Sequence, residues 1–217
     1  MRTLAISIML TFVCFANASV MVFTDRPSFE AALGLPSGGG INTGFEQDSP
    51  QFLFPGTVVL NDFDLTIVGS PNVLNQITCC EPSGSGAIES HYFNGFLSND
   101  VTNGPQEITF SFDTPLYGFG ADFDQANNNG MGMIVNGTLV DFSDLLGPAV
   151  GDLDFGFIGV VDTMMPFSSA TLVMTGGLPN QGEFFRMDNA TLAPVPEPAT
   201  HLLMLFGFLA LLGLRRK

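Results

Sequence analysis

The chain has 217 residues, 46% of them hydrophobic, and a formal net charge of −15. The charge is unevenly placed: all 21 acidic residues lie between positions 25 and 197, where Arg26 and Arg186 are the only basic residues, so this stretch carries −19. Such a surface repels nucleic acid and anionic polymers and attracts cations. A lysine-free body also argues against a nucleotide- or phosphate-binding role.

The first 18 residues have the pattern of a cleavable signal peptide. Arg2 precedes an apolar run over 4–16, and Ala16-Asn17-Ala18 is a typical signal-peptidase site. The run is too short to span a bilayer core of roughly 30 Å. We therefore expect signal peptidase to cleave before Ser19 and the remaining chain to be exported.

Residues 19–193 are predicted to form one all-β domain, an antiparallel β-sandwich of jelly-roll type with one short N-terminal helix. The helix is expected over 25–33, where Phe29, Ala32 and Leu33 share one side and Gly34 follows. After it, short runs alternate with Gly, Pro, Asn and Asp turns, as is typical of such sandwiches. The candidate strands are 57–60, 63–68, 73–78, 107–113, 116–124, 131–135, 138–142, 155–161, 169–175 and 184–192.

The clearest alternation lies in the middle of the chain. In residues 107–113, Ile108, Phe110 and Phe112 point to one face. A turn at Thr114-Pro115 is expected to separate this strand from the next. In that next strand one face is Tyr117, Phe119, Ala121 and Phe123, and the other, expected to be solvated, is Gly118, Gly120, Asp122 and Asp124. Asn136-Gly137 further along is the strongest short hairpin signal in the chain.

Two adjacent cysteines, Cys79 and Cys80, remain once Cys14 leaves with the signal peptide. Export makes a disulfide plausible, but a bond between neighbours closes a strained ring, so a vicinal disulfide and two unpaired thiols both stay open. Zinc needs four ligands, and no further cysteine or histidine cluster accompanies the pair. We interpret the pair as structural.

Catalytic patterns are lacking in the body. His91 is its only histidine, and no serine stands in a Gly-x-Ser-x-Gly elbow. Asp122 and Asp124 are neighbours on one strand face, but alternating acids on a solvated face are common. We therefore expect a protein that is not an enzyme.

Residues 194–217 form a separate pattern. Val195-Pro-Glu-Pro-Ala-Thr200 leads into an apolar stretch, predicted to be helical over about 199–214, and the chain ends on the basic residues 215–217. At ~1.5 Å per residue this stretch is a marginal membrane span, and the positive-inside tendency keeps its basic end cytoplasmic. An ordinary C-terminal anchor and a removable one both have these properties.

The layout of this tail resembles the PEP-CTERM sorting signal. The resemblance is carried by Pro196, Glu197 and Pro198, by the glycine-containing apolar stretch, and by Arg215 and Arg216. His201 departs from it, since an apolar residue is more usual there. The resemblance implies processing by exosortase, a membrane transpeptidase-like enzyme of Gram-negative bacteria that make exopolysaccharide. It also implies transient inner-membrane anchoring by the tail.

The body more loosely resembles jelly-roll carbohydrate-binding-like modules, through residues 119–123 and 187–192. Asn42-Thr-Gly-Phe-Glu46 and Asp188-Asn189 resemble paired elements that hold a structural calcium ion in those modules. The resemblance therefore implies Glu46 and Asp188 as calcium ligands, and hard oxygen donors suit that ion. A strand-capping role for Asp188 is the alternative.

Taken together, these patterns predict a cell-surface or extracellular-matrix protein with a structural or adhesive role in exopolysaccharide or biofilm. A glycan-binding module, dependent on calcium, is the alternative. Exposed tryptophan or tyrosine usually supplies the stacking surface for a sugar, and the body has only Tyr92 and Tyr117. A secreted hydrolase is the third hypothesis.

Overall fold

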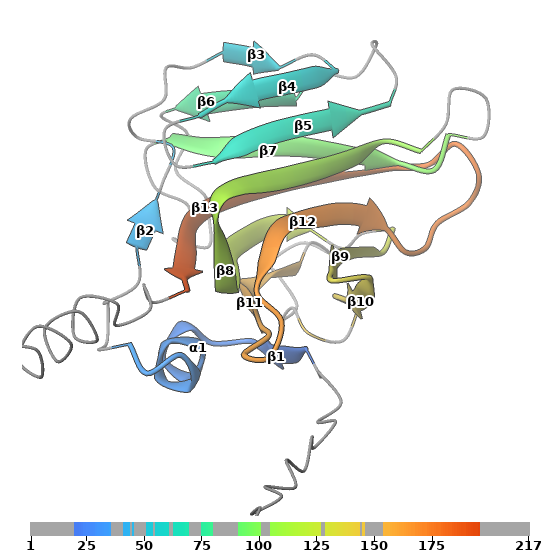
Figure 1. The fold of residues 1–217 in the computed structure, drawn as a ribbon. Coiled ribbons are helices and arrows are strands. Elements are labelled where there is room, and N and C mark those ends of the chain that lie inside the picture. The colour runs from blue at the N-terminus through green and yellow to red at the C-terminus, as the bar shows by residue number, and fades with distance from the viewer. Residues whose placement is uncertain are drawn as a thin grey trace, which may run out of the picture.

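The structure is a computed structural model that describes residues 20–35, 41–43, 45, 51–53, 55–60, 63–69, 75–79, 91–100, 105–126, 129–143, 145 and 154–195. The described part holds one helix and 13 strands (Figure 1). In chain order these are β1 Met21–Phe23, α1 Arg26–Ala32, β2 Ile41–Thr43, β3 Gln51–Leu53, β4 Gly56–Val59, β5 Asp64–Val68, β6 Asn75–Cys79, β7 His91–Ser98, β8 Glu107–Ala126, β9 Met131–Val135, β10 Thr138–Asp141, β11 Asp154–Val161, β12 Phe167–Met174 and β13 Gly182–Pro194. The predicted all-β class with one short N-terminal helix is confirmed.

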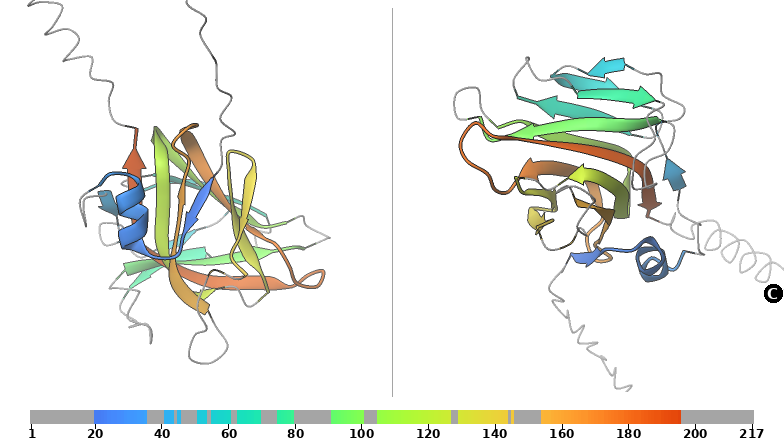
Figure 2. Two further views of the ribbon diagram at one scale, coloured as in Figure 1. Left: turned by 90° about the horizontal axis from the view of Figure 1, so that it is seen from below. Right: turned by 180° about the vertical axis from the view of Figure 1, so that it is seen from behind.

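All pairings among the described strands are antiparallel and join them into one sheet. This sheet folds over on itself because β8 belongs to two layers. Its first half pairs with β5 and β12, giving the layer β4-β5-β8-β12-β9-β10. Its second half pairs with β13 and β11, giving the layer β3-β6-β7-β13-β8-β11-β1. The two layers of the predicted sandwich are thus parts of one continuous sheet (Figures 1 and 2).

β8 changes layers at the position of the predicted Thr114-Pro115 turn. The sequence predicted two separate strands here, and that was wrong: one strand of 20 residues runs through. Its partner β12 pairs Phe167 with Leu116 and then Ser169 with Ser111, so several residues of β8 bulge out between those two pairs. The bulge bends the strand without ending it, which is how a bulge accommodates a proline.

Phenylalanines fill the space between the layers. Phe110, on the first half of β8, meets Phe93 of β7 at 6.4 Å between ring centroids and Phe119 of the second half at 5.4 Å. All three side chains are fully buried. The predicted inward positions Ile108, Phe110 and Phe112 are confirmed, and so are Phe119, Ala121 and Phe123, whereas Tyr117, predicted to share their face, is only half-buried. Burial of these side chains is the main source of stability of the sandwich.

Two local predictions are confirmed by their backbone geometry. Asn136 and Gly137 have φ of 48° and 75°, as the turn of the β9–β10 hairpin requires. At α1, the Asp25 side chain accepts a hydrogen bond from the Ser28 backbone N–H at 2.9 Å, and a proline stands in the first turn. Phe29 is buried as expected, whereas Ala32, predicted to share its face, is exposed.

Candidate functional site

The outer face of the second half of β8, predicted to be solvated, is covered. Gly118 and Gly120 lie on this face and are buried. A Cβ atom on Gly118 would stand 2.8 Å from Cδ1 of Leu33, just after α1, and one on Gly120 would stand 2.5 Å from Cζ of Phe157 in β11. Below α1, Phe29 and Phe157 pack edge to face at 5.4 Å. The helix therefore closes this face, and the glycines leave the room it needs.

Beyond the glycines, the same face carries three aspartates, hereafter the aspartate cluster: Asp122 and Asp124 of β8 and Asp188 of β13. Asp188 pairs directly with Asp122 across the two strands. Two carboxylates in such a position repel each other. Asp188 is fully buried and the Asp122 side chain is 19% exposed, so solvent screens this repulsion only in part. The cluster needs positive charge nearby.

Arg26, in the first turn of α1, supplies part of this charge. Its Nη2 lies 3.0 Å from Oδ2 of Asp122 and donates to the backbone carbonyl of Asn189 at 2.8 Å. Its Nη1 donates to the hydroxyl of Thr191 in β13. The guanidinium also lies over the Phe157 ring, 4.7 Å from the centroid. One arginine thus joins α1, β8, β11 and β13.

The segment of β13 that receives Arg26 is a β-bulge. The register of β13 against β8 shifts between Asp188 and Thr191, and Asn189 has a left-handed backbone with φ 48°. The Asn189 backbone N–H donates to Oδ1 of Asp188 at 2.7 Å, and its amide Nδ2 donates to Oδ2 of Asp122 at 3.2 Å. The bulge turns the Asn189 carbonyl and amide toward the arginine and the aspartates.

Arg186 of β13 is the second basic residue at the aspartate cluster. Its Nη1 is 3.9 Å from Oδ2 of Asp124, and its guanidinium lies 5.3 Å from the centroid of the Tyr92 ring. The two arginines between positions 25 and 197 therefore both face the aspartate cluster. Their scarcity in an acidic body was the signal that could have predicted ion pairs with specific aspartates.

These contacts link α1 to β8 and β13 and therefore suit a structural role. Asp122 and Asp124, considered in the sequence as a glycosidase-like pair, each face a guanidinium, that of Arg26 at 3.0 Å and that of Arg186 at 3.9 Å. Among the residues that the structure describes, no three His, Cys, Asp or Glu side chains form a group that could hold a metal ion.

Half of the predicted calcium pair can be placed. Asp188 is buried in β13, beside the bulge. β2 pairs with the next part of that strand, Thr43 facing Ala190, so the segment leading to Glu46 runs beside β13 up to residue 43. Glu46 itself lies outside the described residues. Calcium binding by Glu46 and Asp188 stays a prediction.

The other predicted site residues lie outside the described side chains. Cys79 ends β6 and pairs through its backbone with His91 of β7. The side chains of these two residues are not described, nor is Cys80, so the disulfide stays a prediction. Pro196, Glu197, Pro198, Arg215 and Arg216 lie beyond Val195, the last described residue.

An exposed aromatic pair occupies the outer face near the start of β13. Phe184 is 62% exposed, and its ring centroid lies 4.4 Å from that of Phe96 on β7. Most of the described phenylalanines are buried in the core, and Phe184 is an exception. The flanking Glu183 and Phe185 are fully buried and point inward, which places Phe184 outward. Strict alternation from Phe185 and Met187 could have identified it.

β13 leads directly into the tail. Pro194 pairs with Leu116 of β8, and the Val195 backbone N–H donates to the carbonyl of Pro115 at 3.0 Å. The residue that follows is Pro196, the first residue of the Pro-Glu-Pro motif. No spacer therefore separates the sheet from the motif. Within the described residues, no helix is long and apolar enough to cross a membrane.

Comparison with known families identifies the tail. Residues 194–217 match the model described as the PEP-CTERM protein-sorting motif. No curated protein matches the chain. The chain thus carries a PEP-CTERM sorting tail directly after its last strand, and this tail marks it as an exported protein that is a substrate of exosortase.

Proposed function

We propose that the β-rich body of this exosortase substrate serves a structural or adhesive, non-enzymatic role at the cell surface or in the extracellular matrix of a Gram-negative bacterium. The observation that carries the proposal is the sorting motif fused without a spacer to the last strand. A body delivered in this way must act outside the cell. Its high negative charge keeps neighbouring copies apart and soluble.

Cell fractionation tests this proposal. In cells with active exosortase, the protein is expected in the extracellular polymer and on the surface. In cells that lack exosortase, it is expected to remain in the inner membrane through its tail. Deleting the gene is expected to weaken the biofilm. A chain whose body is replaced by an unrelated exported domain should be sorted normally yet fail to restore the biofilm; full restoration would contradict the proposed role of the body.

Glycan binding is a second candidate, supported by the exposed Phe96–Phe184 pair. An aromatic ring that is 62% exposed on a sheet offers a stacking surface for the apolar face of a sugar. The outer residue Asn94 of β7 lies one position along the same face, opposite Arg186, and supplies a hydrogen-bonding amide. A neutral polysaccharide fits this surface better than an anionic one because the body carries −19.

Binding to the host's own exopolysaccharide distinguishes the two candidates. Phe184→Ser is expected to weaken binding about tenfold, which corresponds to roughly 1.4 kcal/mol, while leaving the fold intact. Val59→Ser is the matched control, since Val59 is 77% exposed on β4 in the other layer. Equal binding by both variants and the unmodified chain would exclude the ring pair as a glycan site.

A further inference from the structure

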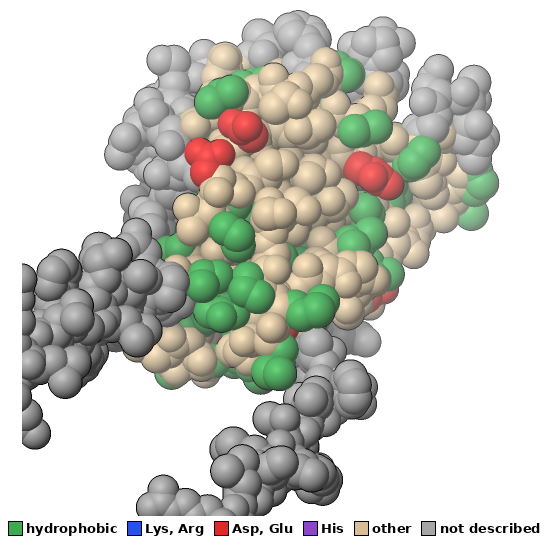
Figure 3. All heavy atoms as spheres, in the orientation of Figure 1, with side chains coloured by type: hydrophobic (Ala, Val, Ile, Leu, Met, Phe, Trp, Pro, Cys, Tyr) green, Lys and Arg blue, Asp and Glu red, His purple; other side chains and the backbone are tan. Residues whose placement is uncertain are grey.

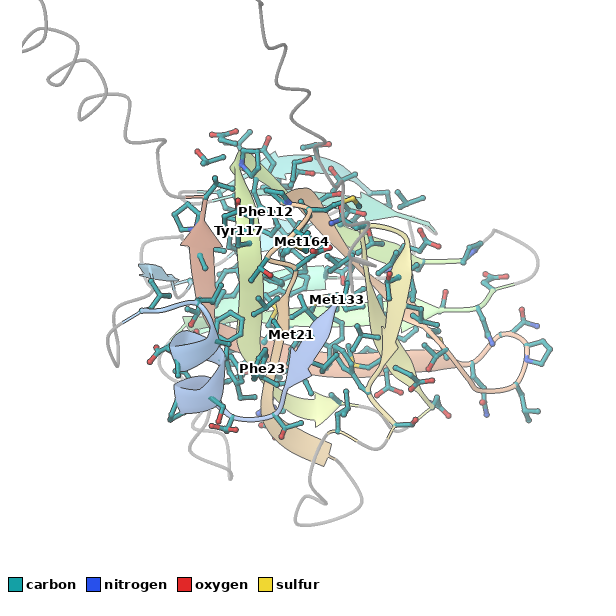
Figure 4. All side chains as sticks on the ribbon, turned by 60° about the horizontal axis from the view of Figure 1, so that its bottom comes forward. Met21, Phe23, Phe112, Tyr117, Met133 and Met164 are labelled. Carbon is teal, nitrogen blue, oxygen red and sulfur yellow. The ribbon has the colours of Figure 1, made fainter. Side chains whose placement is uncertain are left out.

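One end of the sandwich presents apolar side chains next to the start of the tail. The tail-proximal face is defined here by Met21, Val22, Tyr117, Met164 and Met165. Met164 is 57% exposed, Met165 49%, Met21 39% and Val22 38%. Figure 4 shows Tyr117 near Met164 at this end of the molecule, with Met21 further along beside Phe23. Apolar side chains grouped in this way mark an interaction surface more often than chance exposure does.

Strand pairing fixes this face close to Val195. Leu116 of β8 is flanked by Pro194 of β13 on one side and by Phe167 of β12 on the other. The next residue, Tyr117, accepts a hydrogen bond through its carbonyl from the Asp162 backbone N–H at 2.8 Å. Neighbouring strands lie about 4.8 Å apart, so the loop after Asp162 is within roughly 10 Å of the end of β13.

The loop that carries the two exposed methionines is held in one conformation by Asp162, which is 1% exposed. Oδ1 of Asp162 accepts from the backbone N–H groups of Met164 and Met165 at 3.0 and 2.9 Å. Its Oδ2 accepts from the amide of Asn136, at the tip of the β9–β10 hairpin, at 3.1 Å. The acid is therefore turned inward, and the methionines are presented outward without a charge beside them.

Most of the strands and loops that meet here carry no charge, although the exposed Asp25 follows β1 and the exposed Asp113 precedes Thr114 of β8. Residues 114–121, 163–182 and 189–196 contain no Asp, Glu, Lys or Arg. Figure 3 shows apolar side chains gathered over the lower end of β8, while the larger acidic groups in view lie over the upper strands. A body of −19 thus has one end that is apolar and poor in charge, and the tail leaves from it.

The length of chain between the last described residue and the apolar stretch of the tail limits how far this face can lie from a membrane that holds the tail. Ala199, where the apolar stretch of the tail begins, is four positions after Val195. Four extended residues span at most about 14 Å. With the apolar stretch in the bilayer, the tail-proximal face must lie at the level of the lipid headgroups.

We propose that the tail-proximal face rests on the outer surface of the inner-membrane bilayer while the tail is attached, and that it orients the body for exosortase. The inference rests on the proposed function, because it requires a membrane-inserted tail. Methionine, valine and tyrosine side chains enter the interface favourably, whereas the acidic faces are repelled by anionic lipids. Lipid contact also holds the Pro196–Pro198 motif at the membrane surface.

The chain contains no tryptophan, so a single introduced tryptophan reports one position. The full chain is reconstituted in liposomes whose acyl chains are brominated, and three variants are compared. Met164→Trp probes the face and Phe184→Trp probes the opposite end of β13, up to about 33 Å away. Phe206→Trp probes insertion of the tail. We expect blue-shifted, quenched emission from positions 164 and 206 and unquenched emission from position 184.

The outcomes distinguish a failure of membrane anchoring by the tail from a failure of the contact between the tail-proximal face and lipid. Unquenched emission from position 206 would contradict membrane anchoring itself. Quenching at 206 without quenching at 164 would overturn only the contact of the face with lipid. A shift at 164 that grows with the protein-to-lipid ratio would assign the face to a second copy of the chain. In a Val22→Trp variant, adding Met164→Glu and Met165→Glu is expected to abolish the quenching.

Discussion

Arg26 holds together parts of the chain that are far apart in sequence. Asp122 is 96 residues away and Thr191 is 165 residues away. The side chains of Arg26 and Asp122 are 22% and 19% exposed, so the pair is largely withdrawn from water without being sealed. The contribution of this ion pair to the free energy of unfolding should therefore lie between that of an exposed pair and that of a buried one.

A double-mutant cycle measures that contribution. Arg26→Met is expected to lower the free energy of unfolding by about 1–3 kcal/mol, because Asp122 then faces Asp188 without the positive charge of Arg26. Adding Asp122→Asn should recover about 1 kcal/mol of this loss. Urea unfolding of the four proteins provides the measurement. Arg186→Met, which removes the longer 3.9 Å contact to Asp124, should cost less. Strictly additive effects of the first two substitutions would show that the pair is not coupled.

Calcium binding by Glu46 and Asp188 is tested best with variants that respect the local geometry. Asp188→Asn keeps an oxygen that can accept from the Asn189 backbone N–H and removes the charge. At a hundredfold excess over Kd, calcium should stabilise the unmodified protein by about 2.7 kcal/mol. For a domain of this size that is a shift in melting temperature of roughly 5–10 °C. Both Asp188→Asn and Glu46→Gln should lose the shift.

The control for calcium is magnesium at equal ionic strength, since any cation screens an acidic surface. Equal shifts with the two ions, or a calcium shift that survives both substitutions, would leave Asp188 with a purely structural role in the bulge.

At the scale of elements, the sequence predicted those features whose conformation depends only on residues that are neighbours in the chain. Asn136-Gly137 predicted its hairpin because a left-handed backbone is needed there. β7 was missed, since Asn94-Gly95 inside it is typical of a turn. Gly95 is present for a different reason: a Cβ there would stand 2.3 Å from the Phe185 ring of β13. Such a close approach depends on a partner strand distant in sequence, which no local pattern reveals.

In the aspartate cluster too, individual residues were identified from the sequence, whereas contacts between distant segments were not. Asp122 and Asp124 were identified by alternation, and Asp188 by resemblance. Arg26 and Asn189 were not assigned to them, because the contact depends on how α1 packs over β8 and on a bulge in β13. Helix position over a sheet follows from tertiary packing, and spacing within the sequence does not encode it.

The packing of α1 and β11 around the glycines of β8 gives a matched pair of variants. Gly120→Ala places its Cβ 2.9 Å from the backbone Cα of Gly159 and 2.5 Å from the Phe157 ring, and backbone cannot move aside. We expect a loss of about 1–3 kcal/mol in the free energy of unfolding. Gly118→Ala meets chiefly the mobile end of Leu33 and should change stability by less than about 1 kcal/mol. Equal losses of the free energy of unfolding, measured in urea, would show that β11 shifts as readily as the Leu33 side chain.

At the scale of the whole molecule, β13 runs from the exposed aromatic pair to the sorting tail. Its first residues carry the exposed Phe184, and its last residue, Pro194, is the first residue of the matched sorting motif. In the proposed membrane-bound state, the aromatic pair is directed away from the membrane. In that state an end poor in charge lies near the bilayer and the acidic body lies beyond it.

The central claim is that this chain is exported and that its PEP-CTERM tail is removed, and intact-mass measurement of surface-extracted protein tests it most directly. The mass is expected to correspond to a chain that begins at Ser19 and ends between Pro198 and Thr200, with any covalent attachment at the new end added. Protein from cells lacking exosortase should retain the whole tail. A surface-extracted mass that still includes Leu202 to Lys217 would contradict the claim and leave the tail as an ordinary membrane anchor.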